Sequence, residues 1–288
     1  MQILKNINLK DFNSYRLSIT ADIAYFPESV DDLKTIYNGY SADNFFIIGG
    51  GNNIILASET FEKKKFIILR ENFNKCEVEG NDIRVLSGTS LKELSETACK
   101  NGLSGLEIFY DIPGTVGGAI WMNAGAYGEC FFDYVYQVEV LNKKTSQVEI
   151  IPGEEICHGY RYSQFQDNEK VILSAIMRLK PGNKENINQK MQEIYNLRNE
   201  KLPKEYPSAG SVFKRPPDGF PVGMMVEQLG LKGYSIGGAR ISEKHGGFII
   251  NYDNAKPSDI IQLIELIMEK VQKNYGFELH LEQIIVKD

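Results

Sequence analysis

Residues 112–119 read Ile-Pro-Gly-Thr-Val-Gly-Gly-Ala, and residues 122–128 read Met-Asn-Ala-Gly-Ala-Tyr-Gly. In both segments glycines are mixed with small, mostly apolar side chains. Glycine adopts backbone conformations that other residues avoid, and it lets a ligand approach the main chain closely. This long glycine-rich loop therefore predicts backbone that packs tightly against a flat, extended ligand.

A second glycine cluster lies earlier in the chain, after an apolar run. Residues 46–48 are Phe-Ile-Ile, residues 49–53 are Gly-Gly-Gly-Asn-Asn, and residues 54–56 are Ile-Ile-Leu. Such a turn can direct several N–H groups at one anion, and an ordinary glycine turn is an equally good interpretation of three glycines alone. The cluster is not a G-x-G-x-x-G fingerprint, because its third glycine would fall on Ile54 and no helical pattern follows. A dehydrogenase that binds only nicotinamide is therefore disfavoured.

Composition and charge exclude several classes of protein. The chain has 288 residues, 42% of them hydrophobic, which is enough for two or three structural units. A net charge of −6 argues against binding to nucleic acid or to an anionic membrane, since both require a basic face. The N-terminal segment lacks the apolar core of a signal peptide, and no apolar run approaches the roughly 20 residues that cross a bilayer. We therefore expect a soluble, cytoplasmic, monomeric protein without a nucleic-acid or membrane partner.

The cysteines and histidines do not form a metal-binding pattern. No two cysteines form a C-x-x-C pair, and the histidines lack the spacing of metal ligands. We therefore predict reduced thiols and no metal site. The residues concerned are Cys76, Cys99, Cys130, Cys157, His158, His245 and His280.

Short strand-like runs alternate with helical patterns in the first part of the chain, which is typical of α/β organisation. A helix is predicted over 31–40, and Ser90 is predicted to begin another. The predicted strands are 44–48, 66–70, 83–87, 137–141, 148–151 and 171–179. Residues 181–184, Pro-Gly-Asn-Lys, mark a boundary between two units.

The second predicted unit begins with a helix over about 187–198 and ends with a helix and a strand. The late helix is predicted to have Ser258 as its N-cap and Gly276 at its C-terminal stop. Residues 277–286 alternate between apolar and polar side chains, which predicts a strand with Glu282 on its polar face.

Seven motifs in a fixed order give the chain its family resemblance. It resembles the UDP-N-acetylenolpyruvoylglucosamine reductases over nearly its whole length, from Asn13 to Glu282. One motif alone would be weak evidence, but seven in the family's order are not a coincidence. The motifs are residues 47–53, 102–107, 112–119, 122–128, 160–165, 207–214, and 237–239 together with 242–245.

The resemblance implies an α+β protein with an FAD-binding fold of the vanillyl-alcohol oxidase type and a C-terminal α+β substrate-binding domain. The FAD-binding domain would cover 1–183, with two α/β subdomains of about 1–68 and 69–183. The substrate-binding domain would cover 184–288, and its C-terminal strand, 277–287, would carry Glu282 back to the active site.

The activity implied by the resemblance is the reduction of UDP-N-acetylglucosamine enolpyruvate to UDP-N-acetylmuramate in peptidoglycan synthesis, with non-covalent FAD and NADPH as electron donor. The two glycine loops would hold the FAD. The residues implied for this role are Gly49, Gly50, Gly51, Asn52, Asn53, Ile112, Pro113, Gly114, Thr115, Val116, Gly117, Gly118, Asn123, Ala124 and Gly125.

Three residues carry the chemistry that the resemblance implies. Arg161 would bind the substrate carboxylate, Glu282 would pair with it to stabilise the enolate, and Ser211 would protonate the carbon. Only 50 positions separate Arg161 from Ser211, which resembles the second, short-loop type of the family. Tyr160, Lys214 and Arg215 would bind the UDP-sugar.

Each of these residues also has an ordinary interpretation when the resemblance is set aside. Arg161 and Glu282 would be solvated surface charges, and Ser211 would be a turn serine. Two other functions follow from the same residues. One is a flavin oxidoreductase of the same fold that acts on an alcohol or a sugar. The other is a flavin- or nucleotide-binding module without catalysis. The presence of Arg161, Ser211 and Glu282 together argues against this second alternative.

Overall fold

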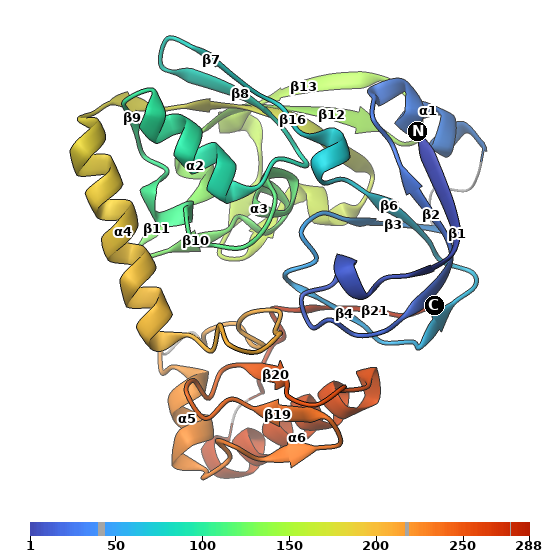
Figure 1. The fold of residues 1–288 in the computed structure, drawn as a ribbon, viewed down its shortest axis with the longest axis vertical. Coiled ribbons are helices and arrows are strands. Elements are labelled where there is room, and N and C mark those ends of the chain that lie inside the picture. The colour runs from blue at the N-terminus through green and yellow to red at the C-terminus, as the bar shows by residue number, and fades with distance from the viewer. Residues whose placement is uncertain (40–43, 217–218, 277) are drawn as a thin grey trace. The chain divides into compact units, whose positions relative to one another are not determined.

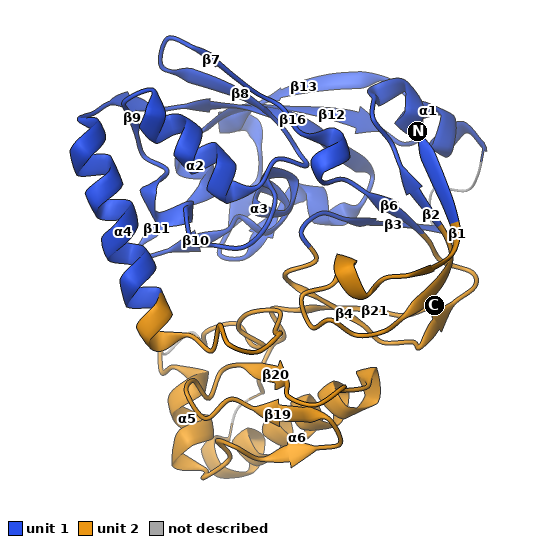
Figure 2. Cartoon of the chain, in the orientation of Figure 1, with its two compact units in different colours: residues 1–4, 24–50, 66–198 blue, residues 5–23, 51–65, 199–288 orange. Residues whose placement is uncertain are grey.

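The computed structural model describes residues 1–39, 44–216, 219–276 and 278–288 (Figure 1). The described chain divides into two compact units, and each unit combines segments that are separated in the sequence (Figure 2). The first unit contains Met1–Leu4, Ala24–Gly50 and Phe66–Arg198. The second contains Lys5–Ile23, Gly51–Lys65 and Asn199–Asp288. This division differs from the predicted limits of 1–183 and 184–288, which follow chain order.

An antiparallel sheet forms the centre of the first unit. Its central strand, β16 (Lys170–Arg178), is buried along most of its length, as its apolar sequence leads one to expect. The sheet confirms the strands predicted around 83–87, 137–141, 148–151 and 171–179. Its strand order is β13 (Val148–Pro152), β12 (Val135–Asn142), β16, β8 (Asp82–Leu86) and β7 (Cys76–Glu79).

Two helices of the first unit begin at the long glycine loop. One starts within it, and the first residue of the other, Leu91, donates its backbone N–H to the carbonyl of Gly114 at 3.0 Å. Helix α2 (Leu91–Lys100) confirms the predicted helix, and the Oγ of its N-cap Ser90 accepts a hydrogen bond from the backbone N of Glu93 at 3.1 Å. Helix α3 (Val116–Met122) lies inside the segment interpreted from the sequence as a loop, and it packs against β8 and β16. Its glycines disfavour a helix locally, so this packing decides its conformation.

The N-terminal sheet contains parallel strand pairs. Its strand order is β1 (Gln2–Asn8), β2 (Thr20–Phe26), β6 (Lys65–Ile68) and β3 (Phe45–Ile48). In the first unit β2 pairs with β6 through Ala24 and Phe66. In the second unit β2 pairs in parallel with β5 (Thr60–Phe61). Strands β3 and β6 confirm the predicted strands at 44–48 and 66–70.

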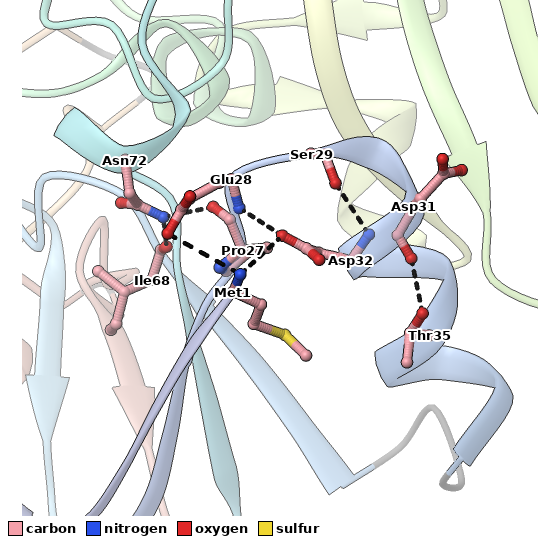
Figure 3. Close-up of polar contacts among 9 residues, drawn as sticks. All are labelled: Met1, Pro27, Glu28, Ser29, Asp31, Asp32, Thr35, Ile68 and Asn72. Atoms are coloured by element: carbon pink, nitrogen blue, oxygen red, sulfur yellow. Dashed lines mark hydrogen bonds and ion pairs between the residues drawn. The ribbon is translucent and has the colours of Figure 1, made fainter.

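Helix α1 (Val30–Gly39) confirms the helix predicted near 31–40, and Tyr40 lies outside the described residues. Hydrogen bonds between side chains and backbone N–H groups cap its N-terminus (Figure 3). The Oγ of Ser29 accepts from the backbone N of Asp32 at 3.2 Å, and the Asp32 carboxylate accepts from the backbone N of Glu28 at 2.9 Å. These bonds satisfy N–H groups that have no partner within the helix, and the bond from Glu28 lowers the pKa of the Asp32 carboxyl.

The remaining elements of the first unit are short, apart from one long helix. Helix α4 (Lys184–Lys201), drawn in yellow in Figure 1, contains the predicted helix at 187–198, and it belongs to this unit as far as Arg198. The short strands pair antiparallel. They are β9 (Leu103–Ser104) with β17 (Lys180–Pro181), β10 (Gly125–Ala126) with β11 (Glu129–Cys130), and β14 (His158–Gly159) with β15 (Tyr162–Ser163).

The second unit contains a small antiparallel sheet covered by a helix. The sheet has the order β18 (Ser235–Ile236), β19 (Ala239–Ile241) and β20 (Ile249–Asn251). Helix α6 (Pro257–Tyr275) packs on β18 and β19 with its apolar face, and it contacts α5 (Val222–Gln228). Among the described residues, no helix is both long and apolar enough to span a membrane.

The start of α6 differs from its prediction, whereas its end agrees. Its N-cap is Lys256 rather than Ser258, because Pro257 occupies the first helical position and the Asp259 carboxylate accepts from the backbone N of Lys256 at 2.9 Å. Proline is suited to this position, since the first N–H groups of a helix have no intrahelical partner. Gly276 ends the helix with a φ of +77°, as predicted.

The last strand is shorter than the predicted strand over 277–287. Strand β21 covers Ile284–Val286 and pairs in parallel with β4 (Ile54–Leu56). Leu281 forms an isolated bridge with Phe213, and Phe277 lies outside the described residues. Glu282 therefore lies before the strand. Its backbone is instead hydrogen-bonded to Val212 and to the side chain of Asn53, both in the second unit.

Candidate functional site

Arg161 lies at the tip of the hairpin formed by β14 and β15. It is one of the few non-glycine residues with a positive φ, at +53°. Such a conformation is uncommon for a residue with a Cβ, and it occurs often where function requires a fixed geometry. The carbonyl of Arg161 accepts a hydrogen bond from the Nε2 of Gln166 at 3.2 Å, which helps to hold this backbone.

The Arg161 side chain has a defined orientation within the first unit. Its Nη2 donates to the carbonyl of Gly125 at 3.0 Å, and its Cζ lies 5.2 Å from the centre of the Tyr160 ring. Cation–π contact of this kind keeps the guanidinium over the ring face. Arg161 and two other predicted site residues, Gly125 and Tyr160, are therefore brought together.

Asn123 connects the Arg161 hairpin to the end of α3. Its φ of +44° ends the helix. Its Nδ2 donates to the carbonyl of Gly159 at 2.9 Å, and its Oδ1 accepts from the backbone N of Phe132 at 3.3 Å. The amide of this predicted cofactor-binding residue therefore positions the strand that leads into Arg161.

The two glycine loops meet within the first unit, and their glycines differ in what surrounds them. A Cβ on Gly49 would collide with the Oγ1 of Thr115, and a Cβ on Gly117 would lie 2.9 Å from the Cβ of Ser87. A Cβ on Gly118 would have its nearest neighbour at 3.6 Å. Gly49 and Gly117 are therefore required by internal packing, whereas a Cβ on Gly118 would make only ordinary van der Waals contact.

Gly114 and Gly125 show the same contrast. A Cβ on Gly114 would lie 4.0 Å from the Cδ1 of Leu91, whereas a Cβ on Gly125 would lie 2.5 Å from the carbonyl oxygen of Glu129. Half-buried Gly114 and exposed Gly118, next to close-packed glycines, form a surface that a flat ligand can approach. This arrangement fits the group that the sequence predicts there.

The remainder of the first glycine cluster belongs to the second unit. Gly51 has a φ of +68°, and a Cβ there would collide with the carbonyl of Phe12. The Nδ2 of Asn52 donates to the Oγ of Ser14 at 2.6 Å, and the Nδ2 of Asn53 donates to the carbonyl of Glu282 at 3.0 Å. The C-terminal end of this glycine cluster is therefore hydrogen-bonded to the backbone of Glu282.

Ser211 and Glu282 are brought together in the second unit. Ser211 is exposed and forms a bridge with Phe248. The next residue, Val212, donates its N–H to the carbonyl of Gly247 at 3.0 Å, and its carbonyl accepts from the backbone N of Glu282 at 2.9 Å. The Ser211 segment is therefore held on one side by Gly247 and on the other by the segment that contains Glu282.

The predicted UDP-sugar residues extend from the same segment. The backbone N of Lys214 donates to the carbonyl of His280 at 2.8 Å. Lys214 is half-buried, and Arg215 is exposed. Tyr160 and Arg161 belong to the first unit, whereas Ser211, Lys214, Arg215 and Glu282 belong to the second.

Some buried and partly buried polar residues form contacts that were not predicted from the sequence. Asp111, directly before the long glycine loop, forms an ion pair with Arg198, whose Nε lies 2.7 Å from its Oδ2. The two side chains are only 10% and 18% exposed. Gln283 is also buried, and the alternation of the C-terminal segment offered a signal for it, since it is a polar residue on the apolar face. Among the described residues, no group of three His, Cys, Asp or Glu side chains is placed to hold a metal.

Comparison with known proteins assigns both parts of the chain. Residues 202–286 match the family model "UDP-N-acetylenolpyruvoylglucosamine reductase, C-terminal domain", and residues 21–150 match the FAD binding domain model. A reductase of this name from Francisella tularensis is 41% identical over 97% of this chain and 99% of its own length. One from Caldanaerobacter subterraneus is also 41% identical, over 98% of this chain and 92% of its own.

A solved structure gives the same result for the fold. The crystal structure of UDP-N-acetylenolpyruvylglucosamine reductase from Thermus caldophilus superposes with a TM-score of 0.85 at 29% identity, covering 99% of both chains. The predicted α+β fold with an FAD-binding domain is therefore confirmed. The chain belongs to the UDP-N-acetylenolpyruvoylglucosamine reductase family, and it is an FAD-dependent oxidoreductase.

Proposed function

We propose that this enzyme reduces UDP-N-acetylglucosamine enolpyruvate to UDP-N-acetylmuramate, with NADPH as electron donor, in peptidoglycan synthesis. Family membership supports the substrate class. The observation that carries the proposal is the 2.9 Å bond between the backbone N of Glu282 and the carbonyl of Val212. It brings the backbone of Glu282 next to Val212, the residue that follows Ser211, and this supports the proposal that both residues act in one site.

The glycine loops are proposed to hold FAD without a covalent bond. The sides of Gly114 and Gly118, where a Cβ would make only ordinary van der Waals contact, support this role, and the close packing of Gly49 against Thr115 keeps the two loops together. Bound FAD would supply the redox chemistry that the reduction of the enolpyruvyl double bond by NADPH requires. The protein residues supply binding, orientation and one proton.

Arg161 is proposed to bind the substrate carboxylate and to stabilise the negative charge that grows beside it. A guanidinium presents a planar fork of N–H donors that matches a carboxylate. The bond to Gly125 and the contact with Tyr160 support this role, because a group that is already oriented needs no rearrangement when charge develops. Glu282 is proposed to act with Arg161 in this stabilisation.

Ser211 is proposed to give its hydroxyl proton to the carbon next to the substrate carboxylate, and water then returns a proton to the serine oxygen. Its exposure in the second unit lets a substrate reach the hydroxyl. Lys214 and Arg215, which follow in the chain, supply positive charge for the diphosphate of the UDP-sugar. Tyr160, which is 59% exposed, supplies a ring for packing against the substrate.

The proposal is tested most sharply by removing the proton donor. The Ser211→Ala variant should bind FAD and accept electrons from NADPH, but turn over about 10² to 10⁴ times more slowly, as is usual for loss of a general acid. The Ser211→Cys variant should recover part of the rate. Ser235→Ala, at an exposed serine of β18 in the same unit, is the matched control. Turnover of Ser211→Ala above about a tenth of the wild-type rate would contradict the role.

The monomeric state, the cytoplasmic location and the preference for NADPH over NADH stay predictions. The first is checked by sedimentation and the last by comparing flavin reduction with each donor.

A further inference from the structure

Gln283 is a buried polar residue whose side chain connects three segments of the second unit. It is 2% exposed. Its Oε1 accepts a hydrogen bond from the hydroxyl of Tyr15 at 2.9 Å. Its Nε2 donates to the carbonyls of Ala209 and Gly210, both at 3.0 Å. Two of these partners directly precede Ser211, and Gln283 itself directly follows Glu282.

The chemistry of the partners fixes the orientation of this amide. Backbone carbonyls only accept hydrogen bonds, so the NH₂ group of Gln283 must face Ala209 and Gly210. Its Oε1 must then face Tyr15, whose hydroxyl donates. Tyr15 is fully buried, and this burial raises the pKa of its hydroxyl, which therefore keeps its proton. A flipped amide would point N–H groups at the tyrosine and an oxygen at two carbonyls.

The bond to Gly210 controls the backbone that carries Ser211. Gly210 has a φ of +79°, a conformation that glycine leaves and enters easily. Its carbonyl belongs to the same peptide unit as the nitrogen of Ser211, so holding this oxygen fixes the plane from which Ser211 continues. The hydrogen bond from Gln283 therefore restricts the backbone conformation of Gly210, which would otherwise be free to change.

The backbone of Gln283 is held from the other side by Asn53. The Nδ2 of Asn53 donates to the carbonyl of Glu282 at 3.0 Å, and the carbonyl of Asn53 accepts from the backbone N of Ile284 at 2.9 Å. The peptide units before and after Gln283 are therefore both fixed. Because its own backbone is fixed, the Gln283 side chain can set the position of the turn at Ala209 and Gly210, to which it is hydrogen-bonded.

We propose that Gln283 and Tyr15 form a positioning pair that sets Ser211 relative to Glu282. The pair acts through these two residues and does not itself contact the substrate. This inference rests on the proposed function, since it requires Ser211 to be the proton donor. The protonation of the substrate carbon is the step that the pair controls.

Two variants test the pair. Gln283→Met keeps the length and unbranched shape of the side chain but removes all three hydrogen bonds, and Tyr15→Phe removes only the bond to Oε1. Both should retain FAD and its rate of reduction by NADPH. Flavin reoxidation by UDP-N-acetylglucosamine enolpyruvate should slow by about 10²-fold in Gln283→Met, the size of effect expected from a small misplacement of a reacting group. Tyr15→Phe should show a smaller loss in the same step.

Tyr37→Phe is the matched control for the loss of a buried hydroxyl. The Tyr37 hydroxyl is buried without a hydrogen-bond partner among the residues that the structure describes. Its removal should leave both half-reactions unchanged. The solvent isotope effect on reoxidation should rise in Gln283→Met and stay at the wild-type value in Tyr37→Phe, because only the former makes proton transfer slower.

A double-mutant cycle separates positioning from a general role in stability. In a Ser211→Ala background, Gln283→Met should add almost no further loss of reoxidation rate, since both changes act on one step. Full additivity, or an equal loss in both half-reactions, would overturn the inference. If Gln283→Met does not fold, the same cycle with Tyr15→Phe decides.

The parallel Ser211→Ala measurement tells the two possible failures apart. A large loss in Ser211→Ala with wild-type reoxidation in both Gln283→Met and Tyr15→Phe refutes the positioning pair and leaves the proposed function intact. Wild-type turnover in Ser211→Ala refutes the proton donor, and the positioning pair with it.

Discussion

Gly117 and Gly118 are neighbours in the sequence but have different surroundings. The missing Cβ of Gly117 faces Ser87, whose Cβ would be 2.9 Å away and whose carbonyl oxygen would be 3.2 Å away. A Cβ on Gly118 would make only ordinary van der Waals contact, 3.6 Å from the Oγ1 of Thr115. A glycine-rich motif can therefore contain some residues required for packing and others available to a ligand, and the sequence does not separate the two.

We expect Gly117→Ala and Gly118→Ala to affect different properties. Overpacking at Gly117 should lower the free energy of unfolding by about 1 to 3 kcal/mol. Gly118→Ala should leave the stability of the apoprotein unchanged or slightly higher, since alanine favours a helix, but should weaken FAD binding. Thermal unfolding of the apoproteins and flavin titration measure the two effects. Unchanged FAD affinity in Gly118→Ala would remove Gly118 from the cofactor site.

Arg161→Lys tests whether the arginine fork is needed in addition to its charge. Lysine keeps the charge but loses the planar donors that bond Gly125 and match a carboxylate. The variant should slow reoxidation by the enolpyruvyl substrate and leave reduction by NADPH unchanged. Arg178→Lys is the control, because Arg178 also lies over a tyrosine ring, that of Tyr136, but pairs with Asp82 at the surface. An equal loss in the two half-reactions of Arg161→Lys would contradict the assigned role.

Motifs supplied the candidate site residues, whereas pairings over long distances could not be predicted. Ser211 and Glu282 lie in segments whose sequences resemble the family. The Tyr15–Gln283 bond connects residues 268 positions apart, and the Asp111–Arg198 pair spans 87 positions. No local pattern encodes either pairing, because each depends on the folded arrangement of separate segments.

Among the elements, helix ends show where local rules succeed and where a neighbouring residue overrides them. Ser90 was correctly predicted at the start of a helix because it directly precedes an apolar helical pattern, and it is the N-cap of α2. Ser258 was wrongly predicted, since Pro257 fits the first turn and moves the cap to Lys256. Helix α3 was missed because its glycines resemble those of a loop, and its packing on β8 and β16 outweighs their low propensity.

The two serines provide a paired prediction of stability. Ser90→Ala removes a cap whose Oγ accepts from Glu93 at 3.1 Å, and it should lower the free energy of unfolding by about 1 kcal/mol. Ser258→Ala lies inside the first turn of α6, so its effect should be within about 0.5 kcal/mol. Denaturant unfolding of both variants measures the difference. Equal destabilisation would contradict the assignment of the caps.

For the whole molecule, the important feature is that its compact units are not continuous in sequence. The family resemblance predicted the α+β class and periodicity predicted most of the elements, but segment 51–65 belongs to the second unit together with residues 199–288. Strand β4 obtains its parallel partner, β21, from the C-terminal end of the chain. The physical reason is that a strand pairs with whichever edge the tertiary fold offers it, and this is not visible in local sequence.

We expect a fragment of residues 1–183 to fail to fold as an independent domain. It lacks β21, and it leaves the buried hydroxyl of Tyr15 without Gln283. An exposed strand edge and an unsatisfied buried donor both destabilise a fold. Circular dichroism and amide hydrogen exchange should show a poorly protected segment 51–65 in the fragment. Protection equal to that of the intact chain would show that 1–183 is a true domain.

The proposed function requires that reduced flavin in this protein is reoxidised by an enolpyruvyl sugar nucleotide. The most direct test is anaerobic stopped-flow absorbance of the purified holoenzyme. NADPH should bleach the flavin, and UDP-N-acetylglucosamine enolpyruvate should then restore its colour with formation of one UDP-N-acetylmuramate per flavin. A flavin that stays bleached with this substrate, but regains its colour with oxygen, would refute the proposed function and favour an oxidase acting on an alcohol or a sugar.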